Sequence, residues 1–401
     1  MRVALWAAGS LNNIGDKLIT SVSEVELERR IPNIAIEQFC PWARGTHPRL
    51  LSIQANGQWT GTGEFDVVIV AGGGVLAGPE FRDPVMKCFV FGERPHRFES
   101  GVLAIWHGVG MQDGFSISKQ CSAERSEFLH NVGRRIDYVA VRDKRTRAAV
   151  SRFAKSPRLV PDPVFAMSAI PAKPSERGRI AVAVGRPDLP AEMLARLCTT
   201  STGDALREAQ GWPSGERGSE KATRYFFALA MALQHLSAVV GLDFVCVDNM
   251  YGDAEYGAQL AGLIPDAAIR HVNCDAAPGA IPLQQLFAEY PLVLCSRFHS
   301  VVLALAAGAD VIAIDPFHES TGEDTKLRSL MGSLGLESQY WNGHAALDGS
   351  ANLADMVASL LKRGNQAERI YRTQHEAAQR SFDELARFLV SNVAGTHSTY
   401  S

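Results

Sequence analysis

Short apolar runs alternate with longer stretches of helical periodicity along most of the chain. Strand-length runs separated by helix-length segments are typical of α/β domains with parallel sheets. Helices are predicted over Lys17–Arg29, Arg224–Val240 and Asn365–Val390. Buried strands are predicted at Val3–Ala7, Val67–Ala71, Val102–Trp106, Tyr138–Val141, Ile180–Val184, Phe244–Val247, Leu292–Cys295 and Val311–Asp315.

The polar stretches of this 401-residue chain indicate where it divides into domains. Ser168–Arg179, rich in proline and charge, is the predicted boundary. We expect an N-terminal α/β domain over 1–170, a C-terminal α/β domain over 177–350, and a helical tail over 351–401 that packs back on the N-terminal domain. The polar stretch 199–221 is predicted to be an insertion of open role. Two doubly wound, Rossmann-like domains facing a cleft are expected, and such clefts hold ligands.

The most informative segment is Leu292–Asp315, in which two buried strands flank an apolar helix. Ser296 is the expected N-cap of this helix, and Gly308 is its expected stop. Arg297 and His299 then fall in the first helical turn, where free N–H groups and the positive end of the helix dipole favour an anion. Because active sites of open α/β sheets lie at the carboxyl ends of strands, we predict a carboxylate or phosphate site here. The alternative is that Arg297 pairs with a structural acid and His299 only caps the helix.

Polar and glycine-rich turns follow two predicted strands near the start of the chain. Asn13 and Asp16 stand between the first strand and the first helix, and Asp16 either caps that helix or orients a substrate hydroxyl. Gly72, Gly73 and Gly74 directly follow the second strand, where glycine N–H groups either surround an anion or let two backbones pass closely. This turn is neither a P-loop nor a GxGxxG motif.

Other candidate side chains stand at the ends of later strands. His107 follows the third strand and is a candidate for proton transfer, with a structural histidine as the alternative. Arg142 ends the fourth strand and is expected to point toward the inter-domain region, unless it forms a surface ion pair. After the last strand, Lys326 is a candidate for a further cation on the same side of the sheet as Arg297, and Glu323 is a candidate for meeting acceptor hydroxyls. The alternative is that these residues form a solvated run of charges.

Composition narrows the classes of function. Hydrophobic residues make up 46% and charged residues 21%, as in ordinary globular enzymes. A net charge of −3 argues against a nucleic-acid-binding surface, and no run approaches the ~18 apolar residues of a membrane span. The seven cysteines are scattered without a Cys-x-x-Cys pair, so neither a disulfide framework nor a zinc site is indicated. No signal peptide is recognisable, so we expect a cytoplasmic protein, at most associated with the inner face of the membrane.

Several of these features together resemble the polysaccharide pyruvyl transferase family. The resemblance rests on Asn-Ile-Gly-Asp at 13–16, the glycines at 72–74, Val-Arg-Asp at 141–143, Leu-Val-Pro-Asp-Pro at 159–163, and Ser-Arg-Phe-His-Ser at 296–300 before an alanine-rich helix. The block at 296–300 is the most specific of these. Phe298 stands where the family's motif has Leu, and Trp106–Gly110 departs from its Gly-Gln-x-Ile-Gly turn.

The resemblance implies a two-domain fold similar to that of B-type glycosyltransferases. It also implies transfer of pyruvate from phosphoenolpyruvate to two hydroxyls of a sugar-containing acceptor, as a ketal with release of phosphate. The resulting candidates are His299, Arg297, Asp16 and His107 for catalysis, Arg142, Arg297, Ser296, Lys326, Gly73 and Gly74 for the donor, and Asp16, Asn13 and Glu323 for the acceptor.

The chemistry of this transfer suits the candidate residues. Phosphoenolpyruvate carries about three negative charges near neutral pH, which calls for arginines and a helix terminus. His299 is the first candidate for protonating the methylene carbon, because histidine has an unperturbed pKa of about 6.5. Asp16 or His107 would accept a hydroxyl proton, while Arg297 and Arg142 would hold the donor and stabilise departing phosphate. The scheme needs no cofactor or metal ion, and no ligand cluster for a metal stands out.

Two alternatives remain open at this stage. A B-type glycosyltransferase with a nucleotide-sugar donor would use the glycine turns and the helix terminus for a diphosphate. A sugar- or metabolite-binding protein would share the fold without turnover. The sequence also leaves open the identity of the acceptor, which includes lipid-linked precursors, the choice between a ketal and an enol ether product, and the oligomeric state.

Overall fold

The chain forms two compact units. The first unit holds Met1–Met167 and the chain from Arg372 onward, and the second unit holds Ser168–Tyr371. The division after Met167 falls at the edge of the proline-rich stretch expected to separate two domains. The computed structural model describes residues 1–6, 13–39, 65–74, 102–111, 136–173, 178–186, 217–247, 252–272, 280–315, 325–342 and 352–397.

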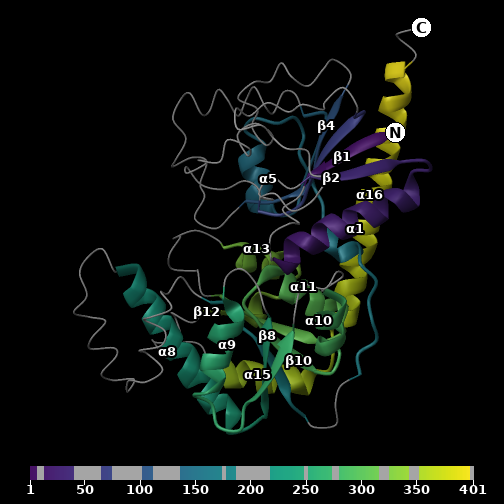
Figure 1. The fold of residues 1–401 in the computed structure, drawn as a ribbon. Helices are drawn as coiled ribbons and strands as arrows, with labels where there is room; N and C mark the ends of the chain where they lie inside the picture. The colour runs from purple at the N-terminus through teal and green to yellow at the C-terminus, as the bar shows by residue number, and fades with distance from the viewer. Residues whose placement is uncertain are drawn as a thin grey trace. The chain divides into compact units, whose positions relative to one another are not determined.

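The first unit is built on a six-stranded parallel sheet (Figure 1). Its strands are β1 (Arg2–Trp6), β2 (Ala35–Phe39), β3 (Val67–Ala71), β4 (Leu103–Val109), β5 (Tyr138–Val141) and β6 (Arg158–Leu159). Its helices are α1 (Ile14–Arg30), α5 (Lys144–Val150), the 3-10 helix η3 (Pro163–Ala166) and most of α16 (Ala367–His397). The strand order is β2-β1-β3-β4-β5-β6, so the order reverses between β1 and β3. Ligands of open α/β sheets bind beyond the carboxyl ends of the strands at such a reversal.

The second unit repeats this plan with a second six-stranded parallel sheet. Its strands are β7 (Ile180–Ala183), β8 (Leu242–Val247), β9 (Ala268–Val272), β10 (Leu292–Cys295), β11 (Asp310–Asp315) and β12 (Tyr340–Asn342). Its helices are α8 (Arg217–Ser237), α9 (Asp253–Ala261), α10 (Ala280–Phe287), α11 (Phe298–Ala306), α13 (Lys326–Ser333), the 3-10 helix η5 (Glu337–Gln339) and α15 (Leu353–Arg363). The order β12-β11-β10-β7-β8-β9 reverses between β7 and β10, as in the dinucleotide-binding fold.

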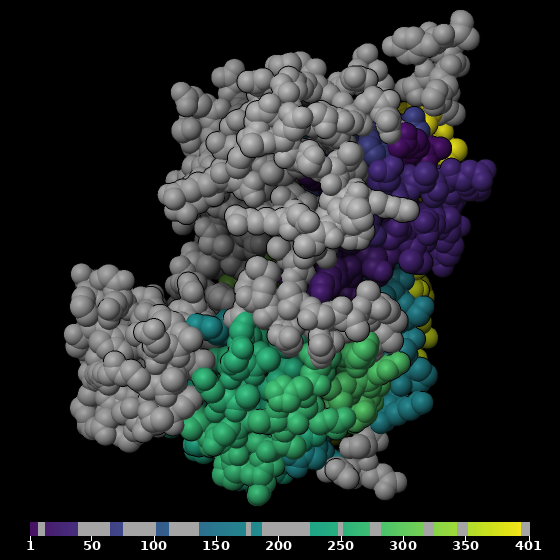
Figure 2. All heavy atoms as spheres, viewed as in Figure 1, coloured from purple at the N-terminus to yellow at the C-terminus, as the bar shows by residue number. Residues whose placement is uncertain are grey.

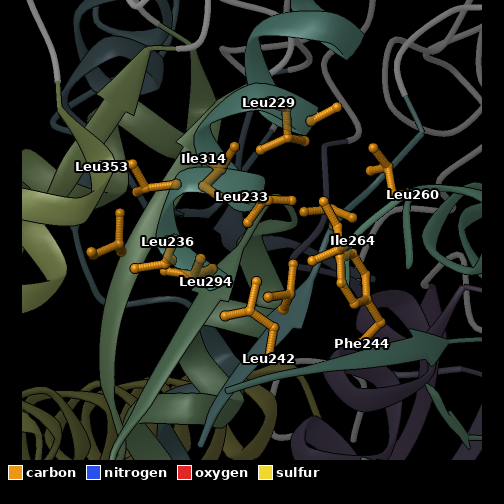
Figure 3. Close-up of a cluster of buried hydrophobic side chains, with 14 of the residues drawn as sticks. Leu229, Leu233, Leu236, Leu242, Phe244, Leu260, Ile264, Leu294, Ile314 and Leu353 are labelled. Atoms are coloured by element: carbon orange, nitrogen blue, oxygen red, sulfur yellow. The ribbon is translucent and has the colours of Figure 1, made fainter. Parts of the chain in front are cut away.

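A large hydrophobic core holds the second sheet in place. Leu229, Leu233 and Leu236 recur at helical spacing on α8 and are fully buried. They join Phe244 of β8 and Leu294 of β10 in one cluster (Figure 3). Each such side chain contributes about 1.5–3 kcal/mol by leaving water. The core thus fixes the strands whose carboxyl ends carry the candidate site. In the space-filling view, the green residues of this unit form one continuous packed surface (Figure 2).

The C-terminal helices are divided between the two units, which differs from the single tail expected over 351–401. Helix α15 belongs to the second unit, and α16 joins the first unit from Arg372 onward. Within the first unit, Arg30 of α1 donates to Asp383 of α16 at 2.7 Å and to the side chain of Gln379 at 2.6 Å. Helix α16 therefore packs on the N-terminal sheet unit.

The prediction of two doubly wound, Rossmann-like α/β domains is confirmed. Each predicted strand is present within a few residues of its expected place, as β1, β3, β4, β5, β7, β8, β10 and β11. Among the described helices, none is long and apolar enough to cross a membrane.

Candidate functional site

Helix α11 begins directly after β10, at the most specific of the sequence motifs. Its N-cap is Arg297, and no side chain caps it. The prediction that Ser296 is the N-cap is therefore wrong, because the helix starts later than expected; the Ser296 hydroxyl is instead buried beside the hydroxyl of Tyr225. Gly308 ends the helix as predicted, with a φ of 71° directly after the C-cap Ala307.

Arg297 is held by a buried carboxylate. Its Nε donates to Asp253 Oδ2 at 2.8 Å, and its Nη2 donates to Asp253 Oδ1 at 2.6 Å. The side chain of Asp253 is 4% exposed, whereas that of Arg297 is 28% exposed. Asp253 is therefore the structural acid with which Arg297 was expected to pair under the alternative interpretation. It fixes the guanidinium while leaving Arg297 partly open to solvent.

The lack of a side chain at Gly185 makes room for this pair. Gly185 follows β7, and a Cβ on it would lie 2.5 Å from Arg297 Nε. The next residue, Arg186, donates its backbone N–H to Asp253 Oδ1 at 2.7 Å. Since β7 and β10 are the neighbours at which the strand order reverses, these contacts lie at the position expected for a ligand site.

His299 lies in the first turn of α11, as predicted. The residue as a whole is half-buried, its Nε2 is buried, and its ring packs edge-on to Phe298, with 5.1 Å between ring centroids. The first intrahelical backbone bond runs from Val301 N to Arg297 O at 3.2 Å. The N–H groups of residues 298–300 therefore precede the helical ladder and form its positive end, beside the Arg297 guanidinium.

A buried polar network lies beyond the carboxyl end of β11. Asp315 is 1% exposed and accepts hydrogen bonds from Thr325 Oγ1 and, at 2.7 Å, from the hydroxyl of Tyr340. Burial and the Asp315 charge raise the pKa of Tyr340, so its hydroxyl keeps its proton and donates. Thr325 also caps α13, whose first residue is the half-buried Lys326. Lys326, the predicted cation, is therefore the first residue of a helix whose N-cap, Thr325, is bound to Asp315.

Tyr225 links the two strand ends. It is fully buried on α8, and burial raises the pKa of its hydroxyl, with the nearby Asp315 adding to the rise and Ser296 and Arg297 opposing it. The hydroxyl is therefore neutral, and it lies near Ser296 and Arg297 after β10 and near Asp315 at the end of β11.

In the first unit, the acceptor candidates gather at the start of α1. Asn13 caps this helix, accepting from Gly15 N at 3.1 Å, and its Nδ2 donates to Asp16 Oδ2 at 2.6 Å. Asn13 therefore performs the capping that was the alternative role of Asp16. The half-buried Asp16 carboxylate is oriented by this amide.

The glycine turn follows β3, next to β1 at the reversal of the first sheet. Gly72 N donates to His107 O at 2.7 Å, Gly73 O accepts from Gly110 N at 2.9 Å, and a Cβ on Gly72 would lie 2.6 Å from Ile19 of α1. Positive φ angles of 52° and 75° at Gly72 and Gly73 suit glycine. Close packing is thus the visible role of Gly72, while anion binding by Gly73 and Gly74 stays a prediction.

His107 is a core residue of the first unit. It is 1% exposed, its Nε2 lies 3.4 Å from Ser381 Oγ, and its ring packs on Phe382 of α16. Burial lowers the pKa of His107 to about 4, although the nearby Asp162 raises it. The structure thus favours a structural role for His107 over a role in proton transfer, because its ring is buried and is neutral near pH 7.

Arg142 is likewise enclosed in the first unit. Its Nη1 donates to Asp162 Oδ2 at 2.7 Å, and the two side chains are 3% and 0% exposed. A Cβ on Gly110 would lie 2.4 Å from Arg142 Nε. Asp162 holds the side chain in a buried ion pair within this unit, in place of the surface pair that was the alternative, and the orientation of Arg142 toward an inter-domain region stays a prediction. We therefore assign Arg142 to the core of this unit.

Sequence reasoning missed the two residues that position Arg297. Gly185 directly follows the predicted strand Ile180–Val184, and Asp253 begins α9 after Gly252. Glu323 lies outside the described residues. Within the described stretches, no group of three or more His, Cys, Asp and Glu side chains gathers closely enough to hold a metal ion.

Comparison with known proteins identifies the family. The family model for polysaccharide pyruvyl transferase matches residues 13–318, which is well over half of the chain. The chain belongs to the polysaccharide pyruvyl transferase family. The match includes Asn13 and Asp16 in the first unit and Arg297 and His299 in the second. No curated protein matches the sequence.

Solved structures of low sequence identity are similar to this chain in fold. UDP-GlcNAc 2-epimerase from Methanocaldococcus jannaschii superposes with a TM-score of 0.50 at 9% identity, over 96% of this chain and 100% of that chain. MnaA from S. aureus, solved with UDP, gives a TM-score of 0.47 at 11% identity, over 94% and 91%. MurG from Acinetobacter baumannii gives 0.44 at 13% identity, over 97% and 99%.

Proposed function

We propose that this member of the family transfers pyruvate from phosphoenolpyruvate to hydroxyls of a sugar-containing acceptor, forming a ketal and releasing phosphate. Family membership supports pyruvyl transfer. One observation carries the choice of donor: Asp253 holds the Arg297 guanidinium beside the positive end of α11, where the strand order of the second sheet reverses. That environment suits a small ligand with more than one anionic group.

The proposed donor site uses the strand ends of the second unit. Arg297 and the first N–H groups of α11 bind an anionic group of phosphoenolpyruvate. Ser296 borders this position, and Lys326 at the start of α13 supplies a further cation. Arg297 also stabilises the charge that develops on the departing phosphate.

His299 is the proposed general acid. It gives its proton to the methylene carbon of phosphoenolpyruvate, which becomes a methyl group, and the adjacent carbon becomes oxocarbenium-like. One acceptor hydroxyl adds to that carbon and loses its proton. A second hydroxyl then displaces phosphate, and its proton is balanced by the one the phosphate takes up. The site needs no redox or metal chemistry for these steps.

The proposed acceptor residues are in the first unit. Asp16 accepts a hydroxyl proton, and Asn13 both caps α1 and orients the Asp16 carboxylate. Sugars present adjacent hydroxyls that suit such a carboxylate and amide. The proposed acceptor is therefore a sugar or glycan, with lipid-linked precursors included in the class.

A thermal-shift titration with phosphoenolpyruvate tests the donor, run beside inorganic phosphate, UDP, GDP and CMP. Ligand binding raises the melting temperature by an amount that grows with ligand concentration over Kd. Phosphoenolpyruvate should raise it at concentrations at which the nucleotides do not. A shift with a nucleotide and none with phosphoenolpyruvate would replace this proposal by nucleotide-sugar transfer.

A further inference from the structure

Asp253 engages one particular edge of the Arg297 guanidinium. Its two carboxylate oxygens accept from Nε and Nη2, the side-on edge of the fork. A guanidinium is planar and offers a second edge, formed by Nη1 and Nη2, on which carboxylates and phosphates also bind in pairs. The contact with Asp253 therefore sets the direction in which the plane of the guanidinium lies.

The carboxylate itself is held rigidly. Asp253 is 3% exposed, begins α9, and accepts from the backbone N–H of Arg186 with the same Oδ1 that binds Arg297. Gly185 closes the arrangement on the other side, since it leaves space for the guanidinium that any side chain would fill. The orientation of Arg297 is thus determined by Asp253, which is 44 residues away in the sequence, and by Gly185, which is farther away still.

We propose that Asp253 is the positioning residue of the donor site, setting the orientation in which the Arg297 guanidinium meets the anionic donor. This inference rests on the proposed function of the same site. Asp253 acts through Arg297 and does not touch the donor, because its carboxylate would repel an anion. Its contribution is selectivity for a ligand of fixed anion geometry over a simple anion.

Charge and orientation predict opposite results for one substitution. Asp253→Asn removes a negative charge beside the site, so if Asp253 only balanced charge, phosphoenolpyruvate would bind more tightly. If Asp253 positions Arg297, the loss of a charge-assisted pair of hydrogen bonds should weaken phosphoenolpyruvate binding roughly 10- to 100-fold. Binding of inorganic phosphate should change much less, so the preference for phosphoenolpyruvate should fall.

The experiment measures Kd for phosphoenolpyruvate and for inorganic phosphate by calorimetry, at a temperature at which each full-length variant is folded. The variants are Asp253→Asn and, as the variant expected to lose the donor, Arg297→Ala. Asp243→Asn is the matched control, because Asp243 forms a comparable pair with Arg179 at the amino end of β8. It should lower stability and leave both Kd values unchanged. If Asp253→Asn does not fold, Gly185→Ala displaces the guanidinium with Asp253 intact.

Each outcome decides a separate claim. Weaker phosphoenolpyruvate binding in Asp253→Asn, with the affinity for inorganic phosphate little changed, supports positioning through Arg297. Unchanged or tighter binding overturns the positioning role and leaves the proposed donor standing. Absence of phosphoenolpyruvate binding by the unsubstituted protein overturns the proposed function, and the inference falls with it.

Discussion

A Cβ on Gly185 would lie 2.5 Å from Arg297 Nε, so the arginine occupies space that only a glycine leaves open. The first unit contains a similar arrangement, in which Gly110 makes room for Arg142. Both arginines follow a strand and pair with a carboxylate at a helix start. They differ in exposure, 28% for Arg297 and 3% for Arg142, and this difference separates a candidate ligand residue from a core residue.

Gly185→Ala should weaken phosphoenolpyruvate binding strongly while the protein stays folded. The added methyl group forces the guanidinium away from Asp253, because real Cβ contacts do not reach 2.5 Å. A loss of roughly 10-fold or more in affinity is expected from the broken charge-assisted bonds. Calorimetry with phosphoenolpyruvate measures it.

Gly332→Ala is the control for this glycine substitution. Gly332 lies in α13, and a Cβ on it would meet only Glu337, at 3.7 Å. It should bind phosphoenolpyruvate normally and gain about 0.5–1 kcal/mol in stability, because glycine disfavours the helix. Equal affinities for the two alanine variants would contradict the packing of Arg297 on Gly185.

His299→Gln should separate binding from turnover. Glutamine keeps a polar side chain in the first turn of α11 but cannot deliver a proton as an acid. Phosphate release from phosphoenolpyruvate in the presence of an acceptor should fall roughly 10²–10⁴-fold, with donor affinity still measurable. Phe298→Leu, a neighbouring change, should stay close to the unsubstituted rate. Near-normal turnover in His299→Gln would remove this residue from the mechanism.

His107 should make the protein sensitive to acid. Burial lowers its pKa to about 4 in the folded state, whereas an unfolded histidine titrates near about 6.5. Between these values the unfolded chain binds a proton that the folded chain does not, so the free energy of unfolding falls as the pH drops. The loss should be on the order of 3 kcal/mol by pH 4.

Urea denaturation at pH 7 and pH 4 measures this effect. His107→Leu removes the titrating group, so its free energy of unfolding should fall less between the two pH values than that of the unsubstituted protein. The comparison uses the change with pH, since the substitution itself alters packing against Phe382. The same pH dependence in both proteins would contradict the assignment of His107 to the core.

Arg142→Ala should destabilise the first unit strongly. It leaves Asp162 buried without its guanidinium, and breaking a buried pair in this way costs about 3–5 kcal/mol. Arg158→Ala is a matched control, because its pair with Glu384 is exposed and such pairs are worth about 0–1 kcal/mol. Denaturation midpoints compare the two. A cost for Arg142→Ala no larger than that for Arg158→Ala would show that the buried pair does not hold this unit together.

The sequence was sufficient to predict the central strands of both sheets, but not the strands at the sheet edges. All predicted strands lie inside the two sheets, where burial on both faces makes an unbroken apolar run. The unpredicted ones are β2, β6, β9 and β12, the four edges. β6 is exposed, and β9 is exposed at all but its last residue, so neither carries the apolar signal on which the prediction relied.

The candidate site was predictable in its local part only. Arg297 and His299 at a helix start follow from the strand, the helix and the stop at Gly308, all within one segment. Asp253 and Gly185 were not predictable, because they reach Arg297 through the folding of separate strands and helices. The local pattern also misplaced the helix start. Either Ser296 or Arg297 can precede the first turn, and the sequence does not show that the Ser296 side chain is buried and Arg297 is the N-cap.

The most direct test of the central claim is a phosphoenolpyruvate titration of the unsubstituted protein and of Arg297→Ala, followed by melting temperature. Arg270→Ala serves as the control, since Arg270 is an exposed arginine of β9 in the same unit. The account predicts a concentration-dependent rise for the unsubstituted protein and Arg270→Ala and none for Arg297→Ala. An equal rise in all three proteins would show that the donor does not bind at the start of α11.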